Sequence, residues 1–543
     1  MRGGSVAAML TCELSRRGVR RMFGVPGGGS SLDLIQAGAG AGIDFVLART
    51  ETAAAIMAAT AAELTGVPGV VLTGLGPGAA AVTNGLAHAH LDRAPLVAIT
   101  DAYPPPVAAF VTHQRIDHAA LFVPLIKGSL SLTAATPHSE VRRLLDLALR
   151  PPRGPVHIDL SGAAAAESMT GEQPAGEEMP APAIGPWQVE RARALLTDAE
   201  RPVLLIGLEA RGAADAARAL ASELGGPVLT TWKAKGTVAD DHPLFVGLVT
   251  GGAAEAACLE GADLIVQFGL DPVELIPQPW RYAAPVVDLA EAVREAYYVR
   301  PAASLIGPLD QGAAALSGIV GRSAWTDSAI RGHRKRMSAA YVVAPSPALG
   351  PQEVVDAALE TAPAGCRATI DAGAHMFPVI ARWPAREPHA VLISNGLATM
   401  GFALPAAIAS ALAEPERRVI AFAGDGGLAM CLGELATAAE QGCAIMVVVF
   451  NDAALSLIDV KQAARGLVQP RLQDHADRLR GLRTRLRARG RAHRIRGRSA
   501  PCPCPRLRRD RTMPARRPHR PARLRRAPQG AARMSAGRAE VLR

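Results

Sequence analysis

The chain has 543 residues, of which 49% are hydrophobic and 20% are charged, and this composition predicts a large soluble protein with two to four domains. Its seven cysteines show no paired CxxC spacing, which argues against a zinc site or a disulfide framework and fits a reducing cytoplasm. No signal peptide is expected at the N-terminus. The most apolar window, 390–413, is interrupted by Asn, Gly and Pro, so no membrane span is predicted.

Short apolar strands alternate with Ala-rich helices from about residue 5 to 160, a pattern typical of a parallel α/β sheet. A Pro-, Glu- and Ala-rich stretch at 177–186 has the composition of a linker, and a second α/β unit follows it. The segment 333–351 is interpreted as another connection before a third unit. The predicted fold class is therefore α/β, with three doubly wound parallel-sheet domains and a tail, over residues 1–165, 187–320, 351–470 and 471–543.

The third unit carries two carboxylates at the ends of predicted strands. The stretch RRVIAFAGDGG ends in a glycine turn that contains Asp425; a helix over 428–442, closed by Gly442, and a strand ending in Asp452 follow it. A right-handed strand–helix–strand unit brings both strand ends to one edge of the sheet, where ligands bind. This arrangement suits Mg²⁺ and a diphosphate, with backbone N–H groups supplied by Gly424, Gly426 and Gly427. Taken alone, GDG favours an ordinary polar turn, because Gly and Asp are common turn residues.

The spacing from GDG to ND resembles the thiamine-diphosphate motif of the acetolactate synthase, pyruvate decarboxylase and benzoylformate decarboxylase family. The family normally ends the motif in NN, so Asp452 replaces an Asn here and adds a negative charge. The resemblance implies thiamine diphosphate and Mg²⁺ as cofactors. It implies Asp425, Asp452 and the backbone carbonyl of Ala454 as metal ligands.

Four segments near the N-terminus resemble the pyrimidine-binding domain of this family: 23–29, 48–73, 74–100 and 112–122. The resemblance implies that Glu51 is the catalytic carboxylate that hydrogen-bonds the aminopyrimidine N1′, and that Pro26, Gly27 and Gly76 contact the cofactor. An acid at a helix start that complements the macrodipole is the alternative for Glu51. His113 and Gln114 align with an active-site loop, and Gln114 is the candidate substrate contact; a solvated loop residue is an equally weighted alternative.

Two more segments complete the resemblance to the diphosphate-binding domain. In 395–412, Met400 matches the apolar residue that forces the cofactor into its V shape, flanked by Gly396, Ala398 and Gly401; ordinary core packing is its alternative. In DAGAH, His375 is a candidate diphosphate contact, with a surface histidine as the alternative. The 187–320 segment resembles the central domain, which in some members holds FAD or ADP; FAD is possible here but not required by the sequence.

The family resemblance implies a cytoplasmic enzyme that decarboxylates or joins small 2-oxo acids, with its sites formed between two subunits of a homodimer or a dimer of dimers. Acetolactate synthases typically carry a Trp where this chain has Lys461, which leaves the substrate open.

The Arg-rich tail is the part of the chain that the resemblance does not explain. Residues 471–543 hold 24 Arg against four acidic residues, and the rest of the chain is acidic, so the net charge of +10 comes from the tail. The tail contains no aromatic residue and no sustained strand pattern, so we expect it to be disordered. Such a segment can attract polyanions such as nucleic acid non-specifically. The chain has 54 Arg and only five Lys, which indicates GC-rich coding DNA, and our hypothesis is that a frameshift near residue 470 produced the tail. An inactive remnant of the family with such a tail is the alternative function.

Overall fold

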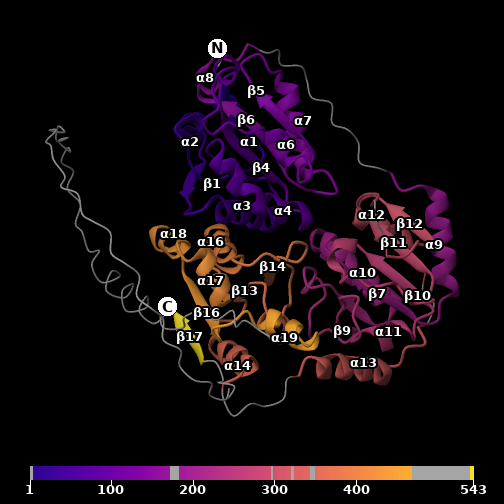
Figure 1. The fold of residues 1–543 in the computed structure, drawn as a ribbon. Helices are drawn as coiled ribbons and strands as arrows, with labels where there is room; N and C mark the ends of the chain where they lie inside the picture. Colours follow the sequence, from indigo (N-terminus) through magenta and orange to yellow (C-terminus); the bar gives the residue numbers. More distant parts are fainter. Residues whose placement is uncertain are drawn as a thin grey trace, which may run out of the picture.

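The computed structural model describes residues 4–170, 183–294, 298–319, 323–342 and 349–467, together with the backbone of 538–542. Figure 1 shows three α/β units, each built on its own sheet, with the N-terminal unit in indigo to purple, the second in magenta and the third in orange. Within this described part of the chain, no helix is both long and apolar enough to cross a membrane.

The first unit is a six-stranded sheet in which every pairing is parallel. In sheet order its strands are β2 (Asp44–Leu47), β1 (Arg21–Val25), β3 (Gly69–Thr73), β4 (Leu96–Ala102), β6 (Val156–Ser161) and β5 (Ser129–Leu132). Its helices are α1 (Val6–Arg16), α2 (Ser30–Gly40), α3 (Glu51–Thr65), α4 (Pro77–Leu91), α5 (Pro105–Ala108), α6 (His118–Phe122), α7 (His138–Leu149) and α8 (Gly162–Ala166). Alternate side chains of β3 and β4 enter two separate hydrophobic cores, so both faces of the sheet are covered by helices.

The second unit repeats this architecture with another six-stranded parallel sheet. In sheet order its strands are β12 (Ala303–Ile306), β11 (Val286–Ala290), β10 (Leu264–Phe268), β7 (Pro202–Ile206), β8 (Val228–Thr230) and β9 (Phe245–Leu248). Its helices are α9 (Pro186–Asp198), the 3₁₀ turn η1 (Leu208–Ala213), α10 (Ala214–Leu224), α11 (Ala256–Leu259), the 3₁₀ turn η2 (Pro272–Glu274), α12 (Leu309–Leu316) and α13 (Asp327–Ala340).

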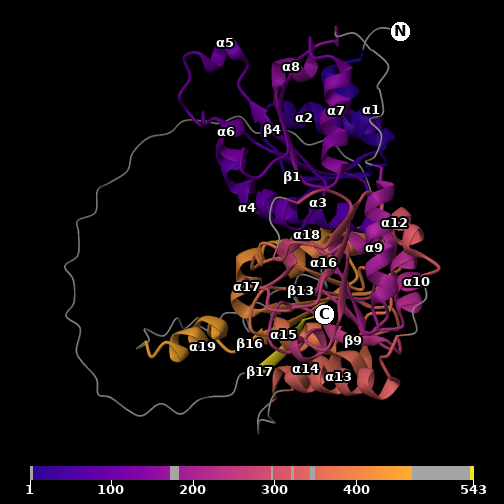
Figure 2. The same ribbon diagram turned by 90° about the vertical axis from the view of Figure 1, so that its right-hand side faces the viewer.

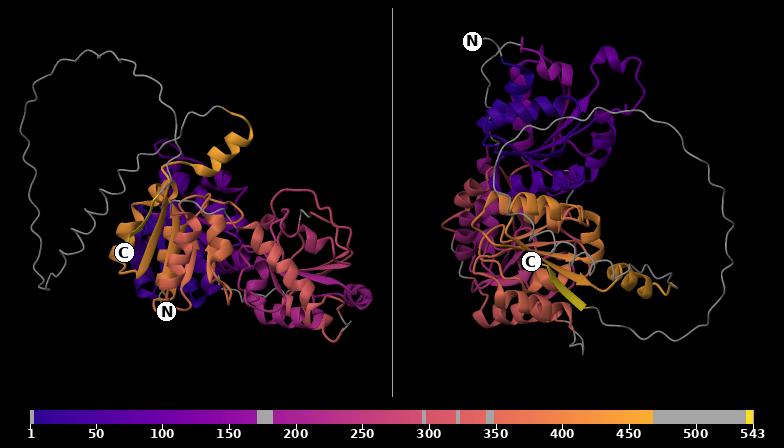
Figure 3. Two further views of the ribbon diagram at one scale, coloured as in Figure 1. Left: turned by 90° about the horizontal axis from the view of Figure 1, so that it is seen from below. Right: turned by 90° about the vertical axis from the view of Figure 1, so that its left-hand side faces the viewer.

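The third unit has four parallel strands and one antiparallel edge strand. In sheet order these are β14 (Val391–Ile393), β13 (Arg367–Ile370), β15 (Val419–Gly424), β16 (Ile445–Asn451) and β17 (Arg538–Leu542). Its helices are α14 (Pro351–Thr361), α15 (Met376–Arg382), α16 (Ala403–Ala413), α17 (Asp425–Cys431), α18 (Glu434–Glu440) and α19 (Ser456–Ala464). Figure 3 shows α19 extending away from the body of this unit, which agrees with its having no buried residue.

Two details differ from the sequence analysis. The helix expected over 428–442 is divided into α17 and α18 at Leu432 and Gly433, although Gly442 follows its end with a positive φ of 63° as expected of a helix terminator. The expected disordered tail lies outside the described residues except for β17, which pairs with β16 where no strand was predicted.

The first and third units pack together through small side chains. Figure 2 shows α3 lying against α16, and alanines of the two helices share one core. Alanine side chains are small, so the two helices can approach closely. Both helices are buried on most sides, and for this reason their sequences show little alternation of polar and apolar faces. The packing joins residues more than 340 positions apart into one body.

All three units meet at a buried charged junction. Lys233, which is 3% exposed and belongs to the second unit, donates to both carboxylate oxygens of Glu63 on α3, at 2.9 and 2.8 Å. Arg211 donates to the same carboxylate at 2.8 Å, and Lys233 also donates to the carbonyl of Ile393 in the third unit at 3.2 Å. Burial raises the pKa of Glu63, but the two cations outweigh it and hold that pKa below its ordinary value.

Candidate functional site

The two predicted metal-binding carboxylates lie at the carboxyl edge of the third sheet. Gly424 at the end of β15 is in register with Phe450 of β16, so the residues that follow each strand meet. Asp425 Oδ2 accepts a hydrogen bond from the backbone N–H of Ala453 at 2.8 Å, directly after Asp452. The adjacency expected from the strand–helix–strand topology is therefore confirmed, and both side chains present oxygen atoms of the kind that Mg²⁺ prefers.

The Asp452 side chain is exposed and is held by its own turn. Its Oδ1 accepts from the N–H of Ala454 at 3.2 Å, and its Oδ2 accepts from the hydroxyl of Ser456. Ala453 has a positive φ of 57°, so the chain reverses sharply at this point. This turn brings the 452–454 segment back toward Asp425.

His375 borders the same edge and is buried rather than on the surface, so the surface alternative is wrong. Its ring stacks on Phe450 with a centroid distance of 5.2 Å, and a Cβ added to Gly424 would lie 3.3 Å from the ring. Burial lowers the pKa of His375 to about 4, so the ring is neutral near pH 7. Its Nε2 is buried and has no hydrogen-bond partner, and such an orphaned polar atom fits a site that receives a polar ligand.

Met400 lies over the glycine turn, in a loop that Asp371 holds. The methyl group of Met400 would be 3.6 Å from a Cβ at Gly426, so the side chain lies next to the GDGG segment. Asp371, at the end of β13, accepts from the N–H groups of Gly401 and Phe402 at 3.1 and 3.2 Å, and burial raises its pKa to about 6. The sequence analysis missed this role of Asp371, although the residue begins the DAGAH motif.

The other predicted residues of this loop are anchored by the first unit. Gly396 donates its N–H to Asp92 Oδ1 at 2.8 Å, and a Cβ at Gly396 would lie 2.6 Å from the carbonyl oxygen of Leu91. Ala398 is exposed with a positive φ of 52°. Only glycine fits position 396, so the close approach of α4 explains that part of the motif.

Glu51 is the first residue of α3 and lies at the carboxyl edge of the first sheet. Thr50 caps the helix by accepting from the N–H of Ala53 at 3.2 Å. The N–H groups of Arg49 and Thr50 both donate to Glu434 Oε1, at 2.9 and 3.1 Å. This position fits both the proposed catalytic role and the helix-start alternative, and Glu434 is a positioning contact that the sequence did not reveal.

Glycine turns surround Glu51 on the same sheet edge. A Cβ at Gly78 would lie 3.3 Å from Glu51 Oε1, and a Cβ at Gly76 would lie 2.3 Å from the backbone oxygen of Gln114. Gln114 itself is exposed and has a positive φ of 55°. The turn from Gly76 to Gly78 therefore lies between the predicted catalytic carboxylate and the predicted substrate contact.

The loop that contains Pro26 and Gly27 is fixed by one buried carboxylate. Asp101, at the end of β4, accepts from the N–H of Gly29 at 3.2 Å and of Ser31 at 2.9 Å. A Cβ at Gly27 would lie 2.0 Å from Asp101 Oδ2, so the loop can take this path only with glycine there. The predicted residues thus form two groups, one at the edge of the first sheet and one at the edge of the third.

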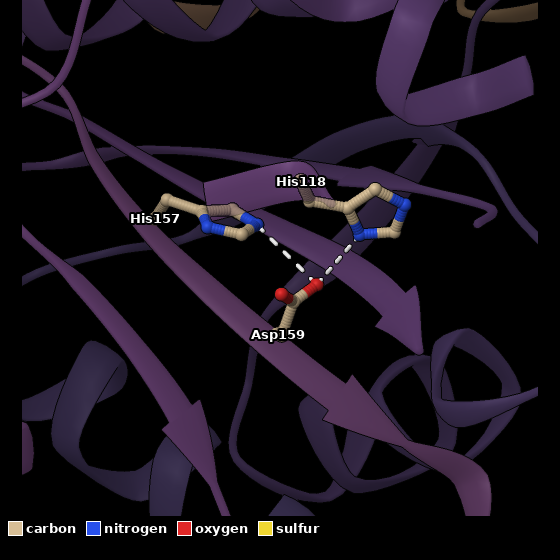
Figure 4. Close-up of side chains that lie close together, drawn as sticks. All are labelled: His118, His157 and Asp159. Atoms are coloured by element: carbon tan, nitrogen blue, oxygen red, sulfur yellow. Dashed lines mark hydrogen bonds and ion pairs between the residues drawn. The ribbon is translucent and has the colours of Figure 1, made fainter. Parts of the chain in front are cut away.

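A buried cluster of metal-ligating residue types was not anticipated. His118, His157 and Asp159 have ligand atoms within 4.8 Å of one another, the single such group of three among the described residues. Figure 4 shows both imidazole rings directed at the Asp159 carboxylate. His157 and Asp159 lie on β6, and His118, at the start of α6, joins them from 41 residues before Asp159.

The central unit carries an acidic cluster at the crevice where a dinucleotide such as FAD would bind. The strands that follow β7 along the chain are added first on one side of it and then, from β10 on, on the other side. In open parallel sheets, ligands bind at such a point, here between β7 and β10. A Cβ at Gly207 would lie 2.2 Å from the Cα of Leu270, so the two loops are in contact at this point. Three buried carboxylates gather there, Glu209, Glu274 and Asp288, and burial raises the pKa of Glu274 to about 7 and that of Asp288 to about 6. Arg294 pairs with Glu209 at 2.8 Å and lies 3.7 Å from Asp288, which offsets part of the negative charge of this cluster.

Three family models match the chain in order. The N-terminal TPP binding domain of thiamine pyrophosphate enzymes matches residues 5–121, the central domain matches 189–311 and the C-terminal TPP binding domain matches 371–478. The acetolactate synthase large subunit of Parasynechococcus marenigrum is 31% identical over 483 residues, which cover 82% of this chain and 76% of that protein. The acetolactate synthase isozyme 1 large subunit of Escherichia coli is 29% identical over 469 residues, covering 83% and 82%. The probable acetolactate synthase large subunit of Methanocaldococcus jannaschii is 29% identical over 474 residues, covering 82% and 80%.

Proposed function

The chain belongs to the thiamine pyrophosphate enzyme family, and from this premise we propose that it is a Mg²⁺-dependent, acetolactate synthase-like enzyme that decarboxylates a 2-oxo acid and joins the product to an acceptor. The observation that supports this most directly is the contact between Asp425 and the N–H of Ala453, because it places two carboxylates at one sheet edge beside three glycines. The buried, unpaired Nε2 of His375 lies at the same edge.

The diphosphate group belongs at the edge of the third sheet. Asp425, Asp452 and the Ala454 carbonyl would hold Mg²⁺, and the N–H groups at the start of α17 would receive phosphate oxygens, since a helix N-terminus favours anions. Bound thiamine diphosphate supplies an electron sink for carbanion chemistry, which side chains alone do not offer. Met400 would support its rings, and His375 would contact the diphosphate.

Glu51 would hold and transfer the proton on the pyrimidine side of the site. Its backbone is fixed by the Thr50 cap and by Glu434, so the carboxylate starts from a defined position. Gln114 would contact the 2-oxo acid. The proposal includes, as the family resemblance implies, a homodimer or a dimer of dimers in which one subunit supplies Glu51 and the other supplies Asp425. The enzyme would act in the cytoplasm.

The test is calorimetric titration of the full chain with thiamine diphosphate and Mg²⁺, followed by an assay of pyruvate consumption. Asp425→Asn should weaken binding at least about 10-fold because it removes a charged metal ligand. Asp44→Asn, at an exposed position on β2, is the matched control and should bind like the unchanged protein. Titration with inorganic pyrophosphate distinguishes the site from the Arg-rich tail. Binding of pyrophosphate to the tail would weaken as salt is added and would be the same in Asp425→Asn as in the unchanged protein. No binding by the unchanged protein would refute the proposal and favour the inactive remnant.

A further inference from the structure

The buried cluster in Figure 4 forms a continuous hydrogen-bond chain rather than an open set of ligands. Thr100 on β4 donates its hydroxyl to Asp159 Oδ1 at 2.6 Å, and its oxygen lies 2.8 Å from His157 Nε2 and 3.3 Å from His118 Nδ1. The Thr100 hydroxyl therefore occupies the centre of the group, where a metal ion would have to lie. None of these side-chain atoms is left buried without a partner. A metal site is for these reasons not the best account of the cluster.

The proton positions in this series of hydrogen bonds can be assigned by starting from the two groups at its ends. The backbone N–H of Gly76 donates to His118 Nε2 at 3.2 Å, so that nitrogen carries no proton. His118 must then carry its proton on Nδ1, which lies 2.7 Å from Asp159 Oδ1 and donates to it. Burial raises the pKa of Asp159, but the hydrogen bonds from His118 and Thr100 outweigh burial and hold that pKa below its ordinary value. Asp159 therefore accepts from both neighbours as a carboxylate.

The second histidine completes the same pattern from the other side. Because the Thr100 hydroxyl donates to Asp159, its oxygen accepts from the Nε2–H of His157, and His157 Nδ1 accepts from the hydroxyl of Ser129 at 2.9 Å. Burial lowers the pKa of His157 to about 4, so this ring stays neutral near pH 7. Every donor in this series of hydrogen bonds has one acceptor, and the tautomer of each ring is thereby fixed.

The series of hydrogen bonds ends at Gly76, on the turn that separates Glu51 from Gln114. Gly76 has φ 57° and ψ −98°, a conformation that residues with side chains rarely adopt, and its backbone packs against the Gln114 carbonyl. Two residues later, Gly78 packs against the Glu51 carboxylate. A shift of the Gly76 N–H would move both neighbours, because helix α4 begins at this turn.

On the basis of the function proposed above, we propose that His118 is a positioning residue: Asp159 fixes its tautomer so that Nε2 accepts from Gly76 and holds the turn between Glu51 and Gln114. If the ring carried its proton on Nε2 instead, two N–H groups would face each other and the turn would be pushed away. His118 would thus act on turnover through backbone geometry, without touching substrate or cofactor.

Two substitutions of His118 separate its hydrogen bonds. In His118→Asn the amide can still donate to Asp159 from the position of Nδ1, but nothing accepts from Gly76. In His118→Gln the side-chain oxygen reaches the position of Nε2 and can accept from Gly76. Both changes remove the ring, so a merely structural role predicts equal losses in the two variants.

The measurements are kcat and KM for pyruvate, the Kd for thiamine diphosphate, and deuterium exchange of the Gly76 amide in the full chain. We expect His118→Asn to lower kcat at least about 30-fold, in the range that small misplacements of reacting groups produce, with Kd nearly unchanged. We expect faster exchange at Gly76 in His118→Asn, and both kcat and exchange close to the unchanged protein in His118→Gln. Equal effects of the two variants, or a kcat for His118→Asn within about twofold of the unchanged protein, would overturn the proposal. Zn²⁺ bound by the unchanged protein but not by Asp159→Asn would also overturn it.

Failure of the proposed function is distinguishable from failure of this inference. If the unchanged protein neither binds thiamine diphosphate nor consumes pyruvate, the proposed function fails. The exchange rate of the Gly76 amide still decides the positioning role, because it needs no cofactor and no substrate. Equal exchange in all three proteins would then refute the hydrogen bond itself.

Discussion

Substitution of Lys233 tests how strongly the three units depend on their buried junction. In Lys233→Met the two hydrogen bonds to Glu63 and the one to the Ile393 carbonyl are lost. Arg211 still satisfies Glu63 Oε2, but Oε1 is left buried without its partner. Removing one member of a buried ion pair destabilises a protein by about 3–5 kcal/mol, and the remaining Arg211 contact favours the lower value of about 3 kcal/mol. Because domains of this size lose about 2–4 °C of Tm per kcal/mol, we expect a drop of about 6–12 °C.

The assay is a thermal unfolding scan at pH 7.5, with Lys335→Met as the matched control because Lys335 is exposed on α13. A double variant, Glu63→Gln with Lys233→Met, should lose less than the sum of the two single variants, since it removes the Glu63 carboxylate that Lys233→Met alone leaves without its partner. A Tm for Lys233→Met within about 2 °C of the control would refute the reasoning, because at 2–4 °C per kcal/mol it would mean that the buried ion pair contributes less than about 1 kcal/mol.

Three further outcomes follow from the site and the central unit. Glu51→Gln should lower turnover of a 2-oxo acid by about 10²–10⁴-fold with cofactor affinity retained, as measured by steady-state kinetics and calorimetry, and a loss below threefold would contradict its role. The raised pKa of Glu274, about 7, means that its contribution to stability is present below about pH 4 and is lost as the pH rises toward 7. Glu274→Gln should therefore flatten the dependence of Tm on pH in that window, and an unchanged slope would count against it. Millimolar ADP or FAD should raise Tm by less than about 1 °C, because the loops at Gly207 and Leu270 are in contact at the crevice where such ligands bind, and a larger rise would show that a nucleotide binds.

The sequence predicted what depends on local pattern and strand topology. Three parallel sheets followed from alternating strands and helices, and the meeting of Asp425 with the segment after Asp452 followed from the rule that such strands end on one edge. Gly76 and Gly396 were selected by resemblance, and the structure supplies the physical reason, since a side chain at either position would meet backbone atoms. The roles of the site residues themselves remain predictions.

What the sequence did not reveal depends on contacts between distant segments. Glu434 has no motif of its own, and its two acceptor contacts depend on how α18 packs against the start of α3. His118 lies within the segment 112–122, but the sequence shows no partner for it, because Asp159 is 41 residues away on strand β6. The burial of His375 likewise depends on stacking against Phe450, which no local pattern encodes.

The contact between Glu434 and the start of α3 has a consequence for synthesis on the ribosome. The N–H of Thr50 emerges 384 residues before the side chain that accepts from it. At translation rates of about 5–20 residues per second, that interval is about 20–75 s. The first sheet can form during this time, but the turn that presents Glu51 lacks its acceptor until α18 has been made and packed. Catalytic competence should therefore arise late, after the N-terminal unit has already acquired its secondary structure.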